Sequence, residues 1–166
     1  MSVLCLYFPR MAVEIACRRH PNLKGRGIVF LEGAGDDAVV AGRSPEAACR
    51  GIFLGMRSGE ARRRVPGIAF LPANGTRVRE ELGRMATNLS EELGLPVSIA
   101  PNSLIVPLPA SAALDRGSEQ YVERLAQAVA ADSGMAVVCG VGASVDEAAA
   151  LARSAARRPA GLKAIG

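Results

Sequence analysis

Hydrophobic and polar positions along the chain fall into blocks that switch between the period of a strand and the period of a helix. The short apolar runs that predict strands lie at residues 2–8, 27–31, 38–41, 68–71, 96–100, 103–106 and 135–141. The segments with apolar side chains every three or four positions, which predict helices, lie at residues 11–19, 44–51, 58–65, 75–93, 117–131 and 144–157. The pattern therefore predicts a fold that contains both sheets and helices.

Turn and cap residues support these boundaries. Gly and Asp dominate residues 32–37 between two predicted strands, which predicts a hairpin, and Pro101-Asn102 predicts a second, tighter one. Ser44-Pro45 is typical of a helix start, and Asn74 is expected to cap the long helix. Ser144-Val-Asp-Glu147 has the pattern of a capping box, in which Ser and Glu side chains satisfy backbone N–H groups at the start of the last helix.

The composition indicates a sizeable core and a modest positive charge. Of the 166 residues, 49% are hydrophobic, which is enough for one domain, or for one domain with a small appendage. The formal net charge is +4, and nearly all of the 20 basic residues are arginines, which suit bidentate phosphate contacts. With no Trp, two Tyr and four Phe, the chain lacks the stacking platform of a single-stranded nucleic-acid binder.

Cysteine and histidine usage argues against a metal centre. The four cysteines are widely spaced, with no Cys-x-x-Cys pair, and the chain has one histidine, so neither a zinc site nor another cofactor is expected. The N-terminus lacks the features of a signal peptide, and no apolar run approaches about 18 residues, so no membrane segment is expected. These features predict a cytoplasmic protein with reduced thiols.

Two groups of arginines and one glycine-rich turn are candidate binding features. The arginines are Arg57, Arg62, Arg63 and Arg64 in the predicted helix at 58–65 and its start, and Arg77 and Arg84 on one face of the long helix. A solvated surface is the favoured interpretation of both groups, and contact with DNA phosphates is the alternative. Gly140-Val-Gly142-Ala-Ser144 is a partial dinucleotide-type turn, for which helix capping is favoured over phosphate binding.

Three long segments of the chain read VLCLYFPRMAVEIACRRHPNLKGRGIVF, EAACRGIFLGMRSGEARRRVPGIAFLPAN and CGVGASVDEAAALARSAARRPAG. In their order and spacing they resemble the palm and fingers of Y-family translesion DNA polymerases, with UmuC-like and catalytically degenerate ImuB-type members the most similar. The resemblance implies an α+β fold: a ferredoxin-like palm with a mixed, mainly antiparallel sheet and helices on one face, and a small inserted fingers subdomain. It implies a palm-like part at residues 1–19 and 74–166 and a fingers-like part at 20–73, with thumb and little-finger domains absent.

The resemblance also implies that the catalytic positions are altered. The family's Asp on the first strand falls on Cys5, and its Asp-Glu pair falls on Ser103 and Leu104. Two Mg²⁺ ions require hard oxygen ligands, and neither residues 2–9 nor residues 93–114 contain an Asp or Glu that a shifted alignment could supply. Further altered positions are Arg10 for the aromatic that screens the sugar, Pro45 and Ala48 for the triphosphate contacts, and Asp146 or Glu147 for the lysine of the last helix. The sequence therefore predicts a protein that is not a polymerase.

The resemblance implies a scaffold or accessory role in DNA repair, translesion synthesis and the damage-induced SOS response. Its expected partners are an active polymerase, a sliding clamp or a RecA-like protein, with weak DNA contact and no membrane association. Two other classes stay open. One is a DNA-binding domain that uses the arginines named above, and the other is a small-ligand or nucleotide enzyme, or a residual nucleotide-binding module, at the Gly140–Ser144 turn. The chain offers no catalytic constellation for such an enzyme, because His20 stands alone.

Overall fold

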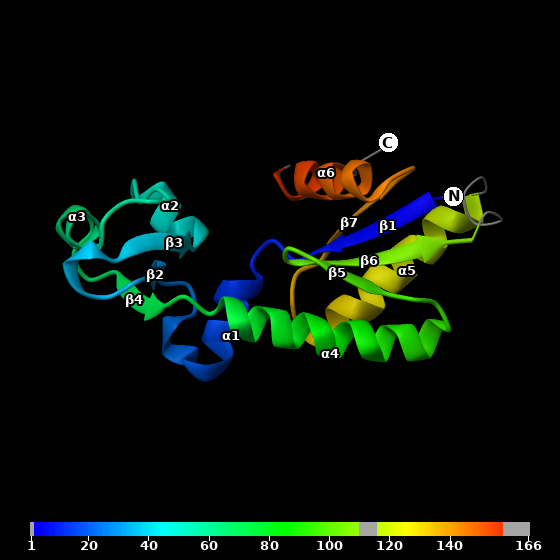
Figure 1. Cartoon of the computed structure of the whole chain (residues 1–166), viewed down its shortest axis with the longest axis horizontal. Coiled ribbons are helices and arrows are strands. Elements are labelled where there is room, and N and C mark those ends of the chain that lie inside the picture. Colours follow the sequence, from blue (N-terminus) through cyan, green and yellow to red (C-terminus); the bar gives the residue numbers. More distant parts are fainter. Residues whose placement is uncertain (1, 110–115, 158–166) are drawn as a thin grey trace. The chain divides into compact units, whose positions relative to one another are not determined.

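The chain forms two compact units. The computed structural model describes residues 2–109 and 116–157, so Arg158-Pro159-Ala-Gly161, the end of the third segment that carries the resemblance, lies outside the described residues. Unit 1 comprises Met1–Met11 and Arg79–Gly166, and unit 2 comprises Ala12–Val78 (Figure 1). The division into palm-like and fingers-like parts at 19/20 and 73/74 remains a prediction.

Unit 1 is built on an antiparallel four-stranded sheet. The strands β1 (Ser2–Tyr7), β5 (Ser98–Ala100), β6 (Ser103–Leu108) and β7 (Val138–Gly142) are arranged in the order β5-β6-β1-β7. Strand β1 is central: Cys5 is paired with Ile105 of β6 on one side and with Gly140 of β7 on the other. The prediction of a tight second hairpin is confirmed, because Pro101 and Asn102 alone separate the paired ends of β5 and β6.

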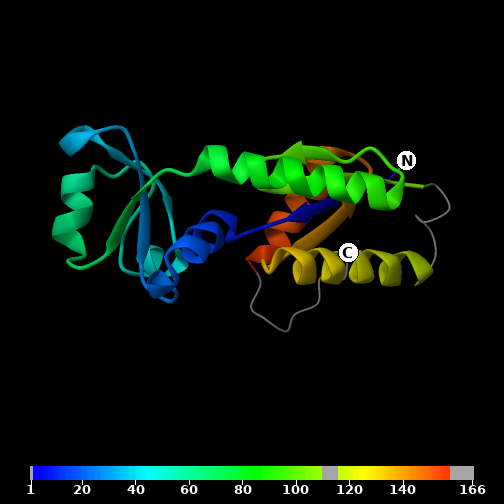
Figure 2. The same ribbon diagram turned by 90° about the horizontal axis from the view of Figure 1, so that it is seen from below.

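Helices cover both faces of this sheet. Helices α4 (Gly75–Leu93) and α5 (Arg116–Ser133) lie on one face, and α6 (Val145–Ala156) lies on the opposite face (Figures 1 and 2). The α+β class is confirmed, but the expectation that the helices share one face is wrong. The physical reason is the composition of β1: Leu4, Cys5 and Leu6 are consecutive and each is fully buried. Since successive side chains of a strand point to opposite faces, such a run needs cover on both.

Unit 2 contains a smaller, mixed sheet. Strands β2 (Ile28–Glu32), β3 (Val39–Arg43) and β4 (Ala69–Pro72) are arranged in the order β3-β2-β4, with the β2–β3 pair antiparallel, as the predicted hairpin requires, and the β2–β4 pair parallel. The other elements are α1 (Met11–Arg19), α2 (Pro45–Cys49), α3 (Ser58–Arg64) and the 3-10 turns η1 (Pro21–Leu23) and η2 (Gly35–Asp37). Helix α1 packs on β2 through Val13 and Ala16.

The predicted caps of α2 and α6 are found where the sequence places them. The hydroxyl of Ser44, fully buried, accepts hydrogen bonds from the backbone N–H of Ala47 at 3.3 Å, which caps α2, and from that of Ile28 at 2.9 Å, which ties the cap to β2. At α6, Ser144 accepts from the N–H of Glu147, and the Glu147 carboxylate accepts from the N–H of Ala143. The predicted capping box is therefore present, with Glu147 bonded one residue before the cap.

Candidate functional site

The first candidate site surrounds Cys5 at the centre of the unit 1 sheet. Cys5 on β1 and Ser103 on β6 point to the same face, since Ser103 is paired with Tyr7, two residues along the strand. Both are buried, with 0% and 3% of their surfaces exposed. The residues packed around Cys5 include Ala148 and Ala152 of α6, so this helix covers the position that the resemblance assigns to the first catalytic carboxylate.

The chemistry of this position does not suit divalent cations. Burial raises the pKa of the Cys5 thiol, while the adjacent Ser103 hydroxyl and the positive charge of Arg153 on α6 lower it in part. The thiol is therefore neutral near pH 7. The Ser103 hydroxyl donates a hydrogen bond to the carbonyl of Pro101 at 2.7 Å. A two-metal Mg²⁺ site relies on hard oxygen ligands, typically carboxylates, and these two groups supply no carboxylate, so the two-metal arrangement of a polymerase does not fit here.

Leu104 does not join Cys5 and Ser103. It is paired with Leu6 and points to the opposite face, where it lies under α4 and α5. The alternation of side chains along a strand was the signal in the sequence that separates Ser103 from Leu104. A second alignment of the family's Asp-Glu pair is available, because this pair belongs to a Ser-x-Asp-Glu motif and Ser98-Ile-Ala-Pro101 has the same spacing. It would assign the Asp to Ala100, which packs against the group around Cys5. With either alignment, no carboxylate accompanies Cys5.

The other altered positions are distributed over both units. Arg10 is exposed between β1 and α1 in unit 1. Pro45 is the exposed first residue of α2, and Ala48 is half-buried on the same helix, both in unit 2. Asp146 and Glu147 lie in the first turn of α6, where acidic groups interact favourably with the helix dipole. Within unit 1, Asp146 and Glu147 thus have a helix-stabilising role.

Three of the six candidate DNA-contacting arginines are engaged by other groups of the protein. The guanidinium of Arg62 lies 4.5 Å from the centre of the Phe70 ring. Arg64 donates to the carbonyl of Gly51 at 3.1 Å and lies 3.5 Å from the Glu60 carboxylate. Arg84 is held by Glu81 at 2.6 Å. The side chains of the other three, Arg57, Arg63 and Arg77, are exposed.

The close packing of α6 on β7 explains the two glycines of the Gly140–Ser144 turn. A Cβ atom added to Gly140 would lie 2.4 Å from the carbonyl oxygen of Ala148 and 2.5 Å from the backbone nitrogen of Ala152. At Gly142, a Cβ would lie 2.8 Å from the backbone nitrogen of Ala148. The glycines therefore let α6 approach β7 closely, and Ser144 caps the helix. Both features explain the turn without a bound phosphate.

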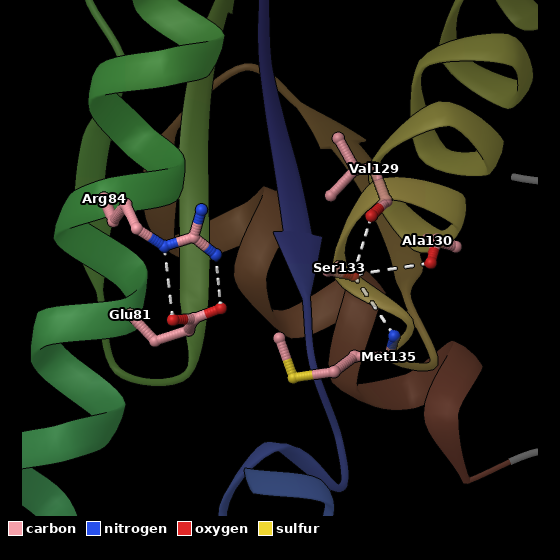
Figure 3. A network of polar contacts seen from close by, with 6 residues as sticks. All are labelled: Glu81, Arg84, Val129, Ala130, Ser133 and Met135. Carbon is pink, nitrogen blue, oxygen red and sulfur yellow. Dashed lines mark hydrogen bonds and ion pairs between the residues drawn. The ribbon is translucent and has the colours of Figure 1, made fainter. Parts of the chain in front are cut away.

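A cleft between α4 and α5 is a feature that sequence reasoning missed. It has a volume of about 80 Å³, its floor is apolar, and its rim carries Arg84, Glu92 and Asp132. Figure 3 shows the Glu81–Arg84 pair on α4 and, at the end of α5, the Ser133 hydroxyl, which donates to the carbonyl of Val129 at 2.6 Å. We refer to this hollow between the two helices as the α4–α5 cleft. The amphipathic patterns of the two helices were the available signal, but they also fit a fully closed core.

Other classes of site are limited by what the described residues contain. Within residues 2–109 and 116–157, no group of three or more His, Cys, Asp or Glu side chains is placed to hold a metal ion. Over the same residues, the helices are too short or too polar to cross a membrane.

Comparisons with solved structures identify the fold. DinB from Sulfolobus solfataricus matches with a TM-score of 0.79 and 17% identity, over 96% of this chain and 46% of that one. An insertion ternary complex of Dbh DNA polymerase matches with a TM-score of 0.79 and 19% identity, over 100% of this chain and 49% of that one. The chain thus spans about half the length of these polymerases. A comparison with curated protein sequences gave no significant match.

A family model completes the assignment. The model of the impB/mucB/samB family matches residues 6–153, which include the end of β1, the hairpin of β5 and β6, β7 and most of α6. The matched region also contains all of unit 2, and Cys5 lies one residue before its start. Because the match covers most of the chain, the protein belongs to the impB/mucB/samB family, and its fold is that of the palm and fingers region of Y-family DNA polymerases.

Proposed function

We propose that this protein is a non-catalytic member of its family that acts in DNA damage tolerance as an accessory or scaffold module. The observation that carries the proposal is the environment of Cys5. A neutral thiol, a hydroxyl and apolar side chains occupy the sheet face where a polymerase needs carboxylates, and α6 covers that face. Phosphoryl transfer depends on positioning and charge stabilisation by metal ions, so a site without ligands loses the main source of rate enhancement.

Primer extension tests the proposal directly. The chain would be incubated with a primed template and all four nucleotides, with Mg²⁺ in one series and Mn²⁺ in another, beside an active Y-family polymerase on the same template. We expect no extension above the buffer control with either metal. Extension by the purified chain that scales with its concentration would overturn the non-catalytic assignment.

The scaffold role implies protein partners in the cytoplasm. The resemblance suggests an active polymerase, a sliding clamp or a RecA-like protein. Each purified candidate would be tested for binding to the chain by biolayer interferometry. Binding of at least one is expected, and failure of all three classes would refute the scaffold role while leaving the primer-extension result unaffected.

A DNA-binding function is the second candidate, and the distribution of charge favours it. Unit 2 has eleven basic residues against six acidic ones, a formal net charge of +5, whereas unit 1 has nine against ten, a net charge of −1. The net positive charge of the chain thus comes from unit 2. Phosphate contacts release counterions, so binding of duplex DNA through unit 2 must weaken steeply with salt. A fluorescence anisotropy titration in which affinity is absent, or unchanged by salt, would reject this function.

A further inference from the structure

Unit 2 presents two exposed apolar side chains on a loop that is otherwise anchored in its core. Residues 51–56 connect α2 to the segment before α3. Ile52 and Met56 are each 1% exposed and belong to the core of unit 2, whereas Phe53 is 47% and Leu54 is 58% exposed between them. We call Phe53 and Leu54 the knuckle. Two adjacent large apolar side chains exposed in this way are a feature of interaction surfaces.

The backbone of the knuckle is fixed in place. Gly51 and Gly55 flank it with φ of +89° and +86°, values that other residues rarely adopt. Arg64 donates to the carbonyl of Gly51 at 3.1 Å, and Arg43 donates to the carbonyl of Ile52 at 2.6 Å. The N–H of Gly55 donates to the carbonyl of Val40 on β3 at 2.8 Å. Because the loop is ordered before any contact forms, a partner that binds the knuckle loses little conformational entropy.

The α4–α5 cleft in unit 1 offers an apolar surface for such side chains. Its floor consists of the apolar side chains of Met85, Leu89, Leu104, Leu125 and Val129. Its volume of about 80 Å³ admits part of an apolar side chain such as Phe or Leu, and it is open to solvent beside the exposed Ala128. The small side chain of Ala128 leaves the cleft open from α5.

The charges around the two surfaces are also complementary. Arg43 and Arg64 bond to the backbone at the base of the knuckle and Arg50 directly precedes it in the chain, in a unit of net charge +5, although Glu60 balances the charge of Arg64. Glu92 and Asp132 border the cleft, in a unit of net charge −1, and the positive charge of Arg84 is balanced there by Glu81. Opposite charges around an apolar contact fix its orientation and speed association.

We propose that the knuckle of one copy of this chain docks into the α4–α5 cleft of a second copy. Phe53 enters the apolar floor, Leu54 covers its edge beside Ala128, and the arginines of unit 2 face Glu92 and Asp132. The contact joins two different surfaces, so it builds either a reciprocal dimer or a chain of molecules. Two anchor side chains make a small interface, which corresponds to a weak and reversible association.

Sedimentation velocity on the full chain tests the proposal. The average mass is expected to rise between about 5 and 500 µM protein at low salt, and to rise less in high salt, where charge attraction is screened. The double variant Phe53→Ser/Leu54→Ser removes the knuckle, and Ala128→Leu fills the cleft. Each variant alone is expected to weaken association at least about tenfold, because interface energy concentrates in a few anchors. Leu151→Ser, which replaces an exposed apolar residue on α6, serves as the control and is expected to associate like the original chain.

Mixing the two variants gives the decisive result. The knuckle variant keeps an open cleft and the cleft variant keeps an intact knuckle, so a one-to-one mixture is expected to recover an association that neither shows alone. Circular dichroism of each variant confirms that it is folded. A chain that stays monomeric throughout, a cleft variant that associates normally, or a mixture that stays monomeric would each overturn the proposal.

Discussion

Replacing Gly140 with alanine should loosen α6 from the sheet of unit 1. The added Cβ would lie 2.4 Å from the carbonyl oxygen of Ala148, well inside the 3.0 Å that real Cβ contacts respect, so helix and strand must separate by about 0.6 Å. Both close contacts are backbone atoms and cannot rotate away. A gap of about 0.5–1 Å forfeits a quarter to a half of the dispersion energy across it. The residues affected include Cys5, Ala148 and Ala152, which are fully buried.

We expect a net loss of about 2–3 kcal/mol in the free energy of unfolding, within the range for overpacked cores. Urea denaturation followed by far-ultraviolet circular dichroism measures this loss. Gly83→Ala is the matched control, because it makes the same chemical change in α4, where the nearest atom to the new Cβ is 3.9 Å away. The control should stabilise the protein by about 0.5–1 kcal/mol, as alanine replaces glycine in a helix. If Gly140→Ala is as stable as Gly83→Ala, the close packing of α6 described above is wrong.

Three further predictions concern a cap and the thiols. Ser44→Ala should lower the free energy of unfolding, measured by urea denaturation, by about 2–3 kcal/mol, because two buried N–H groups lose their acceptor. Ser144→Ala removes an exposed cap and should lower it by about 1 kcal/mol. Equal losses in the two variants would contradict this prediction. In native protein, iodoacetamide should modify the exposed Cys49 well before the buried Cys5, as peptide mass spectrometry would show; the reverse order would contradict the burial. Burial raises the pKa of Cys5, so the folded state keeps a proton that the unfolded state loses above about pH 8.5. The free energy of unfolding, measured by urea denaturation, should therefore decrease from pH 8 to pH 10. This decrease should be less steep in Cys5→Ala, and an equally steep decrease would refute the raised pKa of Cys5.

The sequence predicted the local structure well because its signals are local. Ser44-Pro45 specifies a cap and a first turn, and Pro101-Asn102 closes a hairpin, by preferences that act within a few residues. The helix at 11–19 is found at Met11–Arg19 for the same reason. These elements needed no tertiary information.

The arrangement of the candidate site needed information that a single pattern does not hold. The side of the sheet that α6 covers depends on how a distant part of the chain returns to β1, although the unbroken apolar run of β1 already implied cover on both faces. The orientation of Leu104 was predictable from strand alternation. The exposure of Phe53 and Leu54 was not, because they lie beside Ile52 in an apolar run that would ordinarily be buried.

The packing of α6 over Cys5 has a consequence for substitutions at this position. Aspartate at position 5 would place a carboxylate in a buried, mainly apolar layer, where burial disfavours a charge. The Ser103 hydroxyl and the positive charge of Arg153 would offset this cost only in part, as they do for the Cys5 thiol. An acidic side chain introduced here would therefore weaken the fold of unit 1 before it could serve as a ligand.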